Sequence, residues 1–284
     1  MTYQPLPGFW AAASFAERSA AYDNSKAVAD SPALIAARNA EAAPFRAARP
    51  EHIDIPYQTG DYGAGQRNAW DLFPAKDPAA PCLVFIHGGY WQRNRREDFC
   101  AFMAGALERG WSAALPGYTL APDATLTQIT GEITAALDWL QAHGAEHGIA
   151  GKVVISGWSA GGHLVGMAMP HPLVTAGLAI SGIFELAPIR DTDLDEKLHL
   201  TEAEIAALSP MRLPVVNKPM AIAYGSRELP ELRRQSRDFH ARRAEAHAPG
   251  PLIPVVGADH FRILEALKAP GGELLRACED LLKH

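Results

Sequence analysis

Short apolar runs alternate with longer amphipathic stretches along most of the chain. The apolar runs from residue 81 onward are typical of strands buried on both faces. They are PCLVFIH (81–87), WSAALPGY (111–118), KVVISGW (152–158), LVTAGLAISG (173–182), KPMAIAYGS (218–226) and PLIPVVGA (251–258). Helical spacing fills the stretches 95–110, 126–148, 159–169, 231–248 and 261–284. This alternation predicts an α/β fold, with a mostly parallel central sheet and helices on both of its faces.

The first 50 residues are alanine-rich and form a helical N-terminal extension to this pattern. Helical spacing in 14–30 and 33–49 predicts two short helices packed on the later core. HIDIPYQT (52–59) and NAWDLFPA (68–75) predict strands, separated by the turn-rich GDYGAGQR (60–67).

Residues 183–213 are less regular, and they predict a small inserted cap segment with one or two short helices. No internal repeat, low-complexity tract or linker divides the chain. We therefore expect a single domain over residues 1–284.

The composition narrows the function classes. Apolar residues make up 48% of the 284 residues and charged residues 20%, as in ordinary globular proteins. A net charge of −6 without a basic run argues against nucleic acid and anionic membranes as partners. The three cysteines lie far apart with no CxxC spacing, which suits a reducing compartment and argues against a zinc site. Without a signal-peptide pattern or an 18-residue apolar run, we expect a cytoplasmic protein with no membrane span.

The stretch GWSAGG (157–162) follows the predicted strand 152–158 and begins a predicted helix. It contains G-x-S-x-G, the pattern of a nucleophile elbow, in which a sharp strand-to-helix turn exposes the serine hydroxyl. Ser159 is therefore a candidate nucleophile. The pattern alone is short and common, so its partners have to support it.

A serine nucleophile needs a histidine base and an orienting acid, which follow it in chain order in α/β-hydrolases. His260 lies just past the predicted strand 251–258, where that base is expected. Glu228 is the first acid beyond the strand 218–226, with Glu231 as the alternative. Asp259 adjoins His260 and cannot easily turn back onto its ring. His163 lies four residues past Ser159 on the elbow helix, where we expect packing or capping.

An oxyanion hole is predicted at IHGGYW (86–91), directly after the strand 81–87. Consecutive glycines let backbone N–H groups converge on a carbonyl oxygen, and the N–H after the nucleophile completes the hole. We assign Gly88, Gly89 and Ala160 as the donors. Each motif alone is of moderate specificity, but the ordered set predicts an α/β-hydrolase fold with a serine hydrolase site and no metal.

In that order, HGGYW, PGYTLAP, GWSAGG, ELPELRRQS and DHFRIL resemble the motifs of the kynurenine formamidases, or arylformamidases, of the α/β-hydrolase superfamily. HGG followed by a tryptophan is the most specific element, because lipase-type relatives usually carry HGGG or HGGA. The resemblance extends from about residue 50 to the C-terminus and is weaker in the inserted segment.

The resemblance implies hydrolysis of N-formyl-L-kynurenine to formate and L-kynurenine in tryptophan breakdown, without a cofactor. It implies Ser159 as nucleophile, His260 as base and Glu228 as acid. Many relatives have aspartate at the acid position, so the glutamate is a departure that alters the geometry more than the role.

An aryl leaving group needs an apolar wall. The candidates are Tyr90, Trp91, Phe184 and Phe261, with core packing as the alternative for each. A substrate carboxylate would need a cation or polar donors, and the sequence does not select one.

Two alternative functions remain at this stage. One is an esterase or amidase of the same mechanism acting on another small acyl ester, amide or carbamate. The other is an inactive hydrolase fold used for binding, against which the intact set of Ser159, Glu228 and His260 argues. The partner we expect is a small-molecule substrate. The N-terminal helices could cover the pocket or form a homodimer contact, and both options stay open.

Overall fold

The computed structural model describes residues 7–57 and 67–283. Its centre is an eight-stranded sheet in the order β1-β2-β4-β3-β5-β6-β7-β8. The strands are β1 (Ile55–Pro56), β2 (Ala69–Phe73), β3 (Cys82–Ile86), β4 (Ser112–Pro116), β5 (Val153–Trp158), β6 (Val174–Ile180), β7 (Met220–Gly225) and β8 (Leu252–Val255). The pairs β1–β2 and β2–β4 are antiparallel and the others are parallel. The predicted α/β-hydrolase fold is confirmed, whereas the turn expected at 60–67 lies almost wholly outside the described residues.

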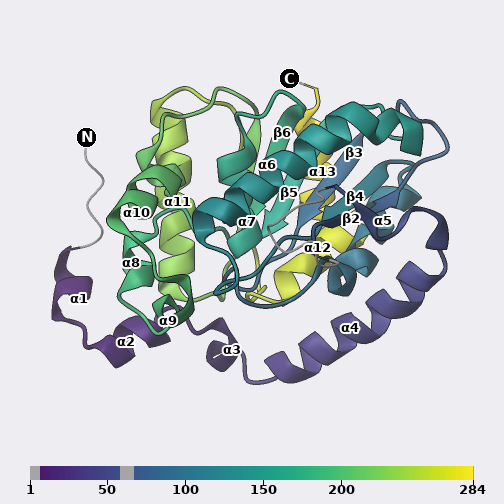
Figure 1. Cartoon of the computed structure of the whole chain (residues 1–284). Helices are drawn as coiled ribbons and strands as arrows, with labels where there is room; N and C mark the ends of the chain where they lie inside the picture. The colour runs from purple at the N-terminus through teal and green to yellow at the C-terminus, as the bar shows by residue number, and fades with distance from the viewer. Residues whose placement is uncertain (1–6, 58–66, 284) are drawn as a thin grey trace.

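Helices cover both faces of the sheet (Figure 1). On one face lie α6 (Leu126–His143), α7 (Ala160–Ala168) and α11 (Pro230–Glu245), and on the other lie α5 (Ala104–Glu108), α12 (Glu265–Lys268) and α13 (Glu273–Leu281). Strand β3 shows how the two cores arise. Its side chains alternate between the two faces, so that Val84 joins one core and Phe85 the other.

Three predicted helical regions differ in detail. The stretch 95–110 begins as a 3₁₀ helix, η2 (Arg96–Met103), before it continues as α5. Beyond α6 the chain forms a short 3₁₀ turn, η3 (Gly144–His147). Near the C-terminus, η5 (Arg262–Leu264) precedes α12.

The inserted segment carries more helices than expected. They are α8 (Ala187–Arg190), α9 (Asp195–Leu198), α10 (Glu202–Leu208) and η4 (Pro210–Arg212). The helix α10 begins at a capping box formed by Thr201 and Glu204.

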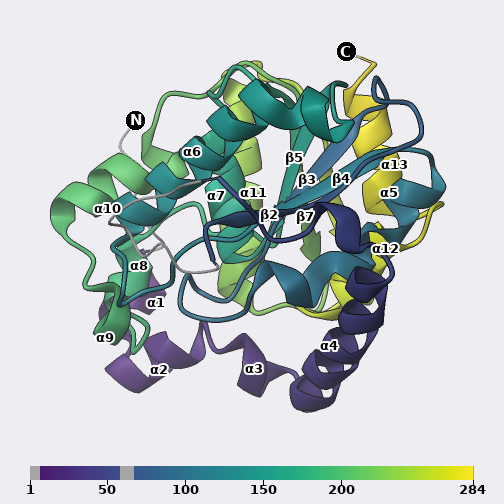
Figure 2. The same ribbon diagram turned by 45° about the vertical axis from the view of Figure 1, so that its right-hand side comes forward.

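The N-terminal extension also forms more helices than the two predicted. It forms α1 (Pro7–Ala12), α2 (Phe15–Ala20), α3 (Asn24–Ala27), α4 (Ser31–Ala47) and η1 (Pro50–His52). Figures 1 and 2 show α1 to α4 passing along the lower edge of the molecule, from α8 and α9 on one side to α12 on the other. The break between α2 and α4 occurs where Asp23 accepts a hydrogen bond from the Lys26 N–H and caps α3.

The carboxyl ends of β5, β6, β7 and β8 meet at one edge of the sheet, because these neighbouring strands are parallel. Ligands of open α/β sheets bind at this edge. The loops that follow the four strands carry Ser159, Ser181, Glu228 and His260.

Candidate active site

Ser159 lies on a strained turn between β5 and α7. Its backbone has φ 58° and ψ −119°, which is unusual for a residue with a side chain, and the residue is 2% exposed. Small neighbours are required here. A Cβ on Gly161 would lie 2.1 Å from the Ile86 carbonyl oxygen, and one on Gly157 would lie 2.4 Å from that of Gly161. The elbow is therefore compatible with glycine alone at these two positions.

Glu228 faces His260 in the loops after β7 and β8. The Glu228 Oε1 atom accepts hydrogen bonds from the Ser181 hydroxyl and from the Gly225 N–H at 2.9 Å. The other oxygen, Oε2, lies 3.7 Å from His260 Nδ1, and neither of these two atoms has another hydrogen-bond partner within the described residues. Two donors thus hold one carboxylate oxygen while the second points at the imidazole. This leaves Nε2 of His260 available for Ser159.

Trp158 also holds His260 in place, in addition to the Glu228 carboxylate. The indole Nε1–H of Trp158 donates to the His260 carbonyl oxygen at 2.8 Å, and the two rings lie 4.8 Å apart between centroids. Because Trp158 directly precedes Ser159, this contact ties the loop after β8 to the elbow.

The alternative acids and base have other partners. Glu231 pairs with Arg234, with 2.7 Å between Oε2 and Nη2. Asp259 accepts the Phe261 and Arg262 N–H groups at 3.0 and 2.9 Å. The His163 Nε2 atom contacts the Leu208 carbonyl oxygen at 2.7 Å, and burial lowers the pKa of this ring to about 4. These three side chains are committed to structural contacts.

The loop after β3 approaches the elbow closely. A Cβ on Gly88 would lie 2.5 Å from the Trp158 carbonyl oxygen and 2.9 Å from Ser159 Cβ, so no larger residue fits. Gly89 has φ +117°, a conformation that favours glycine. The N–H groups of Gly88, Gly89 and Ala160 have no acceptor among the described residues.

Two side chains orient the peptide between Gly88 and Gly89. The Gly88 carbonyl oxygen lies 2.9 Å from His87 Nδ1 and accepts from Asn94 Nδ2 at 3.0 Å. Because C=O and N–H point in opposite directions in a trans peptide, these contacts turn the Gly89 N–H away from His87 and Asn94. Gly89 lines the cavity beside Ser159. Burial lowers the pKa of His87 to about 3, so this ring is neutral near pH 7.

Ser159 and His260 open into a cavity of about 310 Å³. Its far wall consists of residues from the N-terminal extension, namely Ser19, Tyr22, Asp23, Asn24, Ser25, Lys26, Ile35 and Arg38. Of the two roles left open for the N-terminal helices, the structure shows the first, because they cover the cavity. The sequence did not identify which residues form this wall, because nothing in an alanine-rich segment indicates which distant loop it will pack on.

Two of the four predicted aromatic residues line the cavity, Tyr90 and Phe261. The Tyr90 hydroxyl donates to the Tyr22 carbonyl oxygen at 2.6 Å and so holds the N-terminal wall. The expectation was wrong for Trp91 and Phe184, which lie in the core. Trp91 packs edge-on against His163 at 5.0 Å, and Phe184 stacks on Phe239 at 4.3 Å.

The described residues contain no group of three or more His, Cys, Asp or Glu side chains arranged to hold a metal ion. No helix in the described ranges combines the length and hydropathy that crossing a bilayer requires.

Comparison with known proteins places this geometry in context. The sequence profile of the family described as BD-FAE matches residues 71–171. The chain is 25% identical to a kynurenine formamidase of Danio rerio over 76% of each protein. It is 28% identical to a kynurenine formamidase of Salmo salar over 72% of this chain and 75% of the relative.

Solved structures are similar over most of the chain. A candidate thioesterase from Silicibacter sp. TM1040 shares 26% identity and superposes with a TM-score of 0.80, covering 93% of this chain and 99% of that one. Esterase B from Lactobacillus rhamnosis shares 20% identity and the fold, with a TM-score of 0.69 over 90% of this chain and 97% of that one.

The protein is therefore a hydrolase of the α/β-hydrolase superfamily. Within that superfamily, the comparisons confirm the resemblance to the kynurenine formamidases.

Proposed function

We propose that this protein hydrolyses the formyl amide of N-formyl-L-kynurenine to formate and L-kynurenine, as a step of tryptophan degradation. The observation that carries the proposal is the lining of the cavity at Ser159. The aromatic part of this lining consists of Tyr22, Tyr90, Trp158 and Phe261. Side chains of both charges also line the cavity, namely Arg38, Arg93, Lys26, Asp23 and Asp193. An aromatic amino acid with an aryl group, an ammonium and a carboxylate matches this combination. The similarity to kynurenine formamidases over about three quarters of the chain supports it further.

The first half of the proposed reaction forms an acyl-serine. His260 removes the Ser159 proton as the hydroxyl oxygen attacks the formyl carbon. The Gly88, Gly89 and Ala160 N–H groups stabilise the negative oxygen of the tetrahedral intermediate. The imidazolium then protonates the aniline nitrogen as the C–N bond breaks, and L-kynurenine leaves.

The second half returns the enzyme to its starting state. His260 removes a proton from water as the water attacks the formyl-serine. The ester bond breaks, Ser159 regains its proton and formate leaves. The Glu228 carboxylate faces the imidazole throughout and stabilises its charged form.

A second candidate is an esterase or thioesterase with the same machinery. The observation that favours it is the candidate thioesterase of similar structure, which shares 26% identity over 93% of the chain. The acyl-serine chemistry would be unchanged, and only the leaving group would differ.

A paired assay separates the two candidates. The purified protein and its Ser159→Ala variant receive N-formyl-L-kynurenine and p-nitrophenyl butyrate in parallel, and kcat/KM is measured for each. We expect the formamide to be favoured by orders of magnitude and the variant to be inactive on both substrates. Cleavage of the ester through Ser159 without cleavage of the formamide would favour the esterase.

A further inference from the structure

One cation that lines the cavity comes from the N-terminal helix α4. The Arg38 side chain is 9% exposed and borders the cavity together with Ser159, Asn94 and Trp158. Its guanidinium carbon lies 4.3 Å above the Phe99 ring, which packs in turn against Trp158. This buried arginine has no part in the acyl-transfer steps derived above.

The charge of Arg38 is only partly compensated by protein groups. Its Nε donates to Asn39 Oδ1 at 3.0 Å and its Nη2 to Asn94 Oδ1 at 3.2 Å, both neutral acceptors. The carboxylate paired with it is Asp98, at 3.9 Å from Nη2, and Asp98 also faces Arg95 at 3.6 Å. Within the described ranges, Arg38 Nη1 donates no hydrogen bond. Burial lowers the pKa of Arg38 to about 10, so the group remains a cation near pH 7. A buried cation of this kind gains stability from an anionic ligand.

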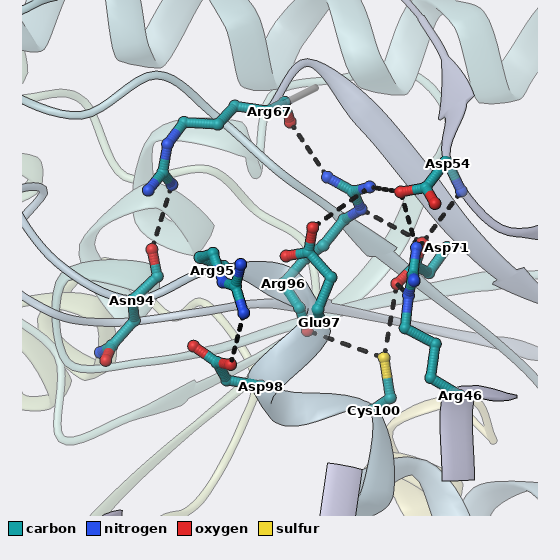
Figure 3. Close-up of polar contacts among 10 residues, drawn as sticks. All are labelled: Arg46, Asp54, Arg67, Asp71, Asn94, Arg95, Arg96, Glu97, Asp98 and Cys100. Carbon is teal, nitrogen blue, oxygen red and sulfur yellow. Dashed lines mark hydrogen bonds and ion pairs between the residues drawn. The ribbon is translucent and has the colours of Figure 1, made fainter. Parts of the chain in front are cut away.

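The helix that carries Arg38 is fixed to the body of the protein. Near its C-terminal end, Arg46 contacts the fully buried Asp71 of β2, with 2.8 Å between Nε and Oδ2 (Figure 3). Arg96 pairs with the same carboxylate at 3.2 Å. Burial raises the pKa of Asp71, but the two guanidinium groups and the hydrogen bond from the Asp54 N–H together outweigh burial and hold this pKa below its usual value. These contacts keep α4, and with it Arg38, in one position.

Arg38 is also linked to the predicted oxyanion hole. The Asn94 side chain accepts from Arg38 and donates to the Gly88 carbonyl oxygen, while Arg67 Nη1 holds the Asn94 carbonyl oxygen at 3.1 Å (Figure 3). An anion on Arg38 would therefore lie where α4 meets the oxyanion loop. Nearby Lys26 and Arg93 are less suited, because both are exposed and Lys26 already pairs with Asp23 at 3.0 Å.

We propose that Arg38 binds the carboxylate of the substrate and makes the site selective for carboxylate-bearing acyl compounds. This rests on the proposed formamidase function for the identity of the substrate. The class of ligand follows from the site itself, because a planar guanidinium with free N–H donors binds a carboxylate through charge-assisted hydrogen bonds.

The test compares substrates with and without the carboxylate. N-formylkynuramine keeps the aryl formamide and the ammonium group of N-formyl-L-kynurenine and lacks only the carboxylate. For Arg38→Met, we expect kcat/KM on N-formyl-L-kynurenine to fall about 100-fold, mainly through KM, and on N-formylkynuramine to change less than about threefold. Arg38→Lys restores part of the loss. The matched control is Arg49→Met, an exposed arginine that lies over the Phe45 ring at 4.0 Å and does not line this cavity, and it stays within about threefold on both substrates.

An equal loss on both substrates would overturn the proposal, because it would assign Arg38 a structural role through Asn94. An unchanged kcat/KM on both would overturn it as well. If the wild-type protein does not cleave N-formyl-L-kynurenine, the proposed function fails, and 4-acetoxybenzoate against phenyl acetate, two acetyl esters that differ in a carboxylate on the leaving group, then tests Arg38 separately. Loss of the 4-acetoxybenzoate preference in Arg38→Met supports the carboxylate site in that case. An equal response of the two esters refutes it.

Discussion

The two sides of the cavity at Ser159 are held in place by different kinds of contact. On the sheet side, the turns after β3 and β5 approach so closely that Gly88, Gly157 and Gly161 have no room for a Cβ. On the opposite side, the N-terminal helices are attached through side chains, such as the hydrogen bond from Trp10 to Asp191 at 3.1 Å. The first side is fixed by backbone packing, which tolerates almost no change. The second depends on separate polar contacts, each of which can be altered alone.

This difference indicates that the two sides of the cavity have different roles in the reaction. The sheet side carries the groups proposed to perform acyl transfer, and those groups suit any small acyl substrate. The N-terminal side carries Tyr22, Asp23 and Arg38, which line the cavity and which we propose contact the part of a substrate beyond the acyl group. Changes on the sheet side should therefore lower turnover of every substrate, whereas changes on the N-terminal side should alter the choice among substrates.

The largest effect is expected at the acid. Glu228→Gln removes the charge that faces His260 and should lower kcat about 10³–10⁴-fold on formamide and ester alike. The matched control is Glu231→Gln, the acid in the first turn of α11, which should retain kcat within a few-fold. Kinetics on both substrates measure this, and the reverse ranking of the two variants would assign the acid to Glu231.

The next effect concerns the oxyanion loop. Gly88→Ala places a methyl group against the Trp158 carbonyl oxygen and displaces the loop, and we expect kcat to fall about 10²–10³-fold. Gly131→Ala on α6 is the control, because among the described residues nothing beyond the adjacent backbone of α6 itself lies within 4 Å of the new methyl group. Thermal unfolding and kinetics of both variants check this. A folded Gly88→Ala protein with full activity would show that these N–H groups are not the oxyanion donors.

A smaller effect is expected at Ser181, which follows β6 and donates to Glu228. Ser181→Ala leaves the Gly225 N–H as the remaining donor to Oε1, so the carboxylate becomes less well oriented. We expect kcat to fall about tenfold with KM unchanged, because Ser181 is buried and is not among the residues that line the cavity. A change in KM with constant kcat would place Ser181 in substrate binding instead.

The smallest effect is a pH dependence of stability. The folded pKa values of His87 and His163, about 3 and about 4, lie below the value of about 6.5 in an unfolded chain. Between these limits the unfolded state binds more protons, so the free energy of unfolding should decrease as the pH falls from about 6.5 to 4. Urea unfolding across this range measures the slope. His163→Gln, which keeps a donor for the Leu208 carbonyl oxygen, should flatten it, and an unchanged slope would show that His163 does not contribute.

The candidate catalytic residues on the sheet side could be predicted from sequence because each belongs to a short, recognisable stretch of the chain. The elbow, the HGG loop and His260 each lie directly after a strand, and parallel strands bring those positions to one edge whatever the loops contain. The orienting contacts of Asn94 and Ser181 escaped notice because a single polar residue in a loop carries no pattern. Their positive φ values of 72° and 53° are visible only in the structure.

The N-terminal side could not be predicted for a different reason. Its position depends on long-range contacts, such as that between Arg46 and Asp71, which helical spacing does not reveal. The wrong assignment of Trp91 and Phe184 has a related cause. Each lies close in sequence to a loop of the site, but the direction of a side chain in an irregular turn depends on how that turn packs.

The most direct test of the central claim is to identify the residue that reacts. The protein is treated with a fluorophosphonate, the modified peptide is located by mass spectrometry, and the remaining hydrolysis of N-formyl-L-kynurenine and p-nitrophenyl butyrate is measured, with Ser159→Ala as the control. We expect one modified residue, Ser159, with loss of all hydrolysis in proportion to labelling and no labelling of the variant. Hydrolysis that persists after Ser159 is fully modified, or modification at another residue alone, would contradict it.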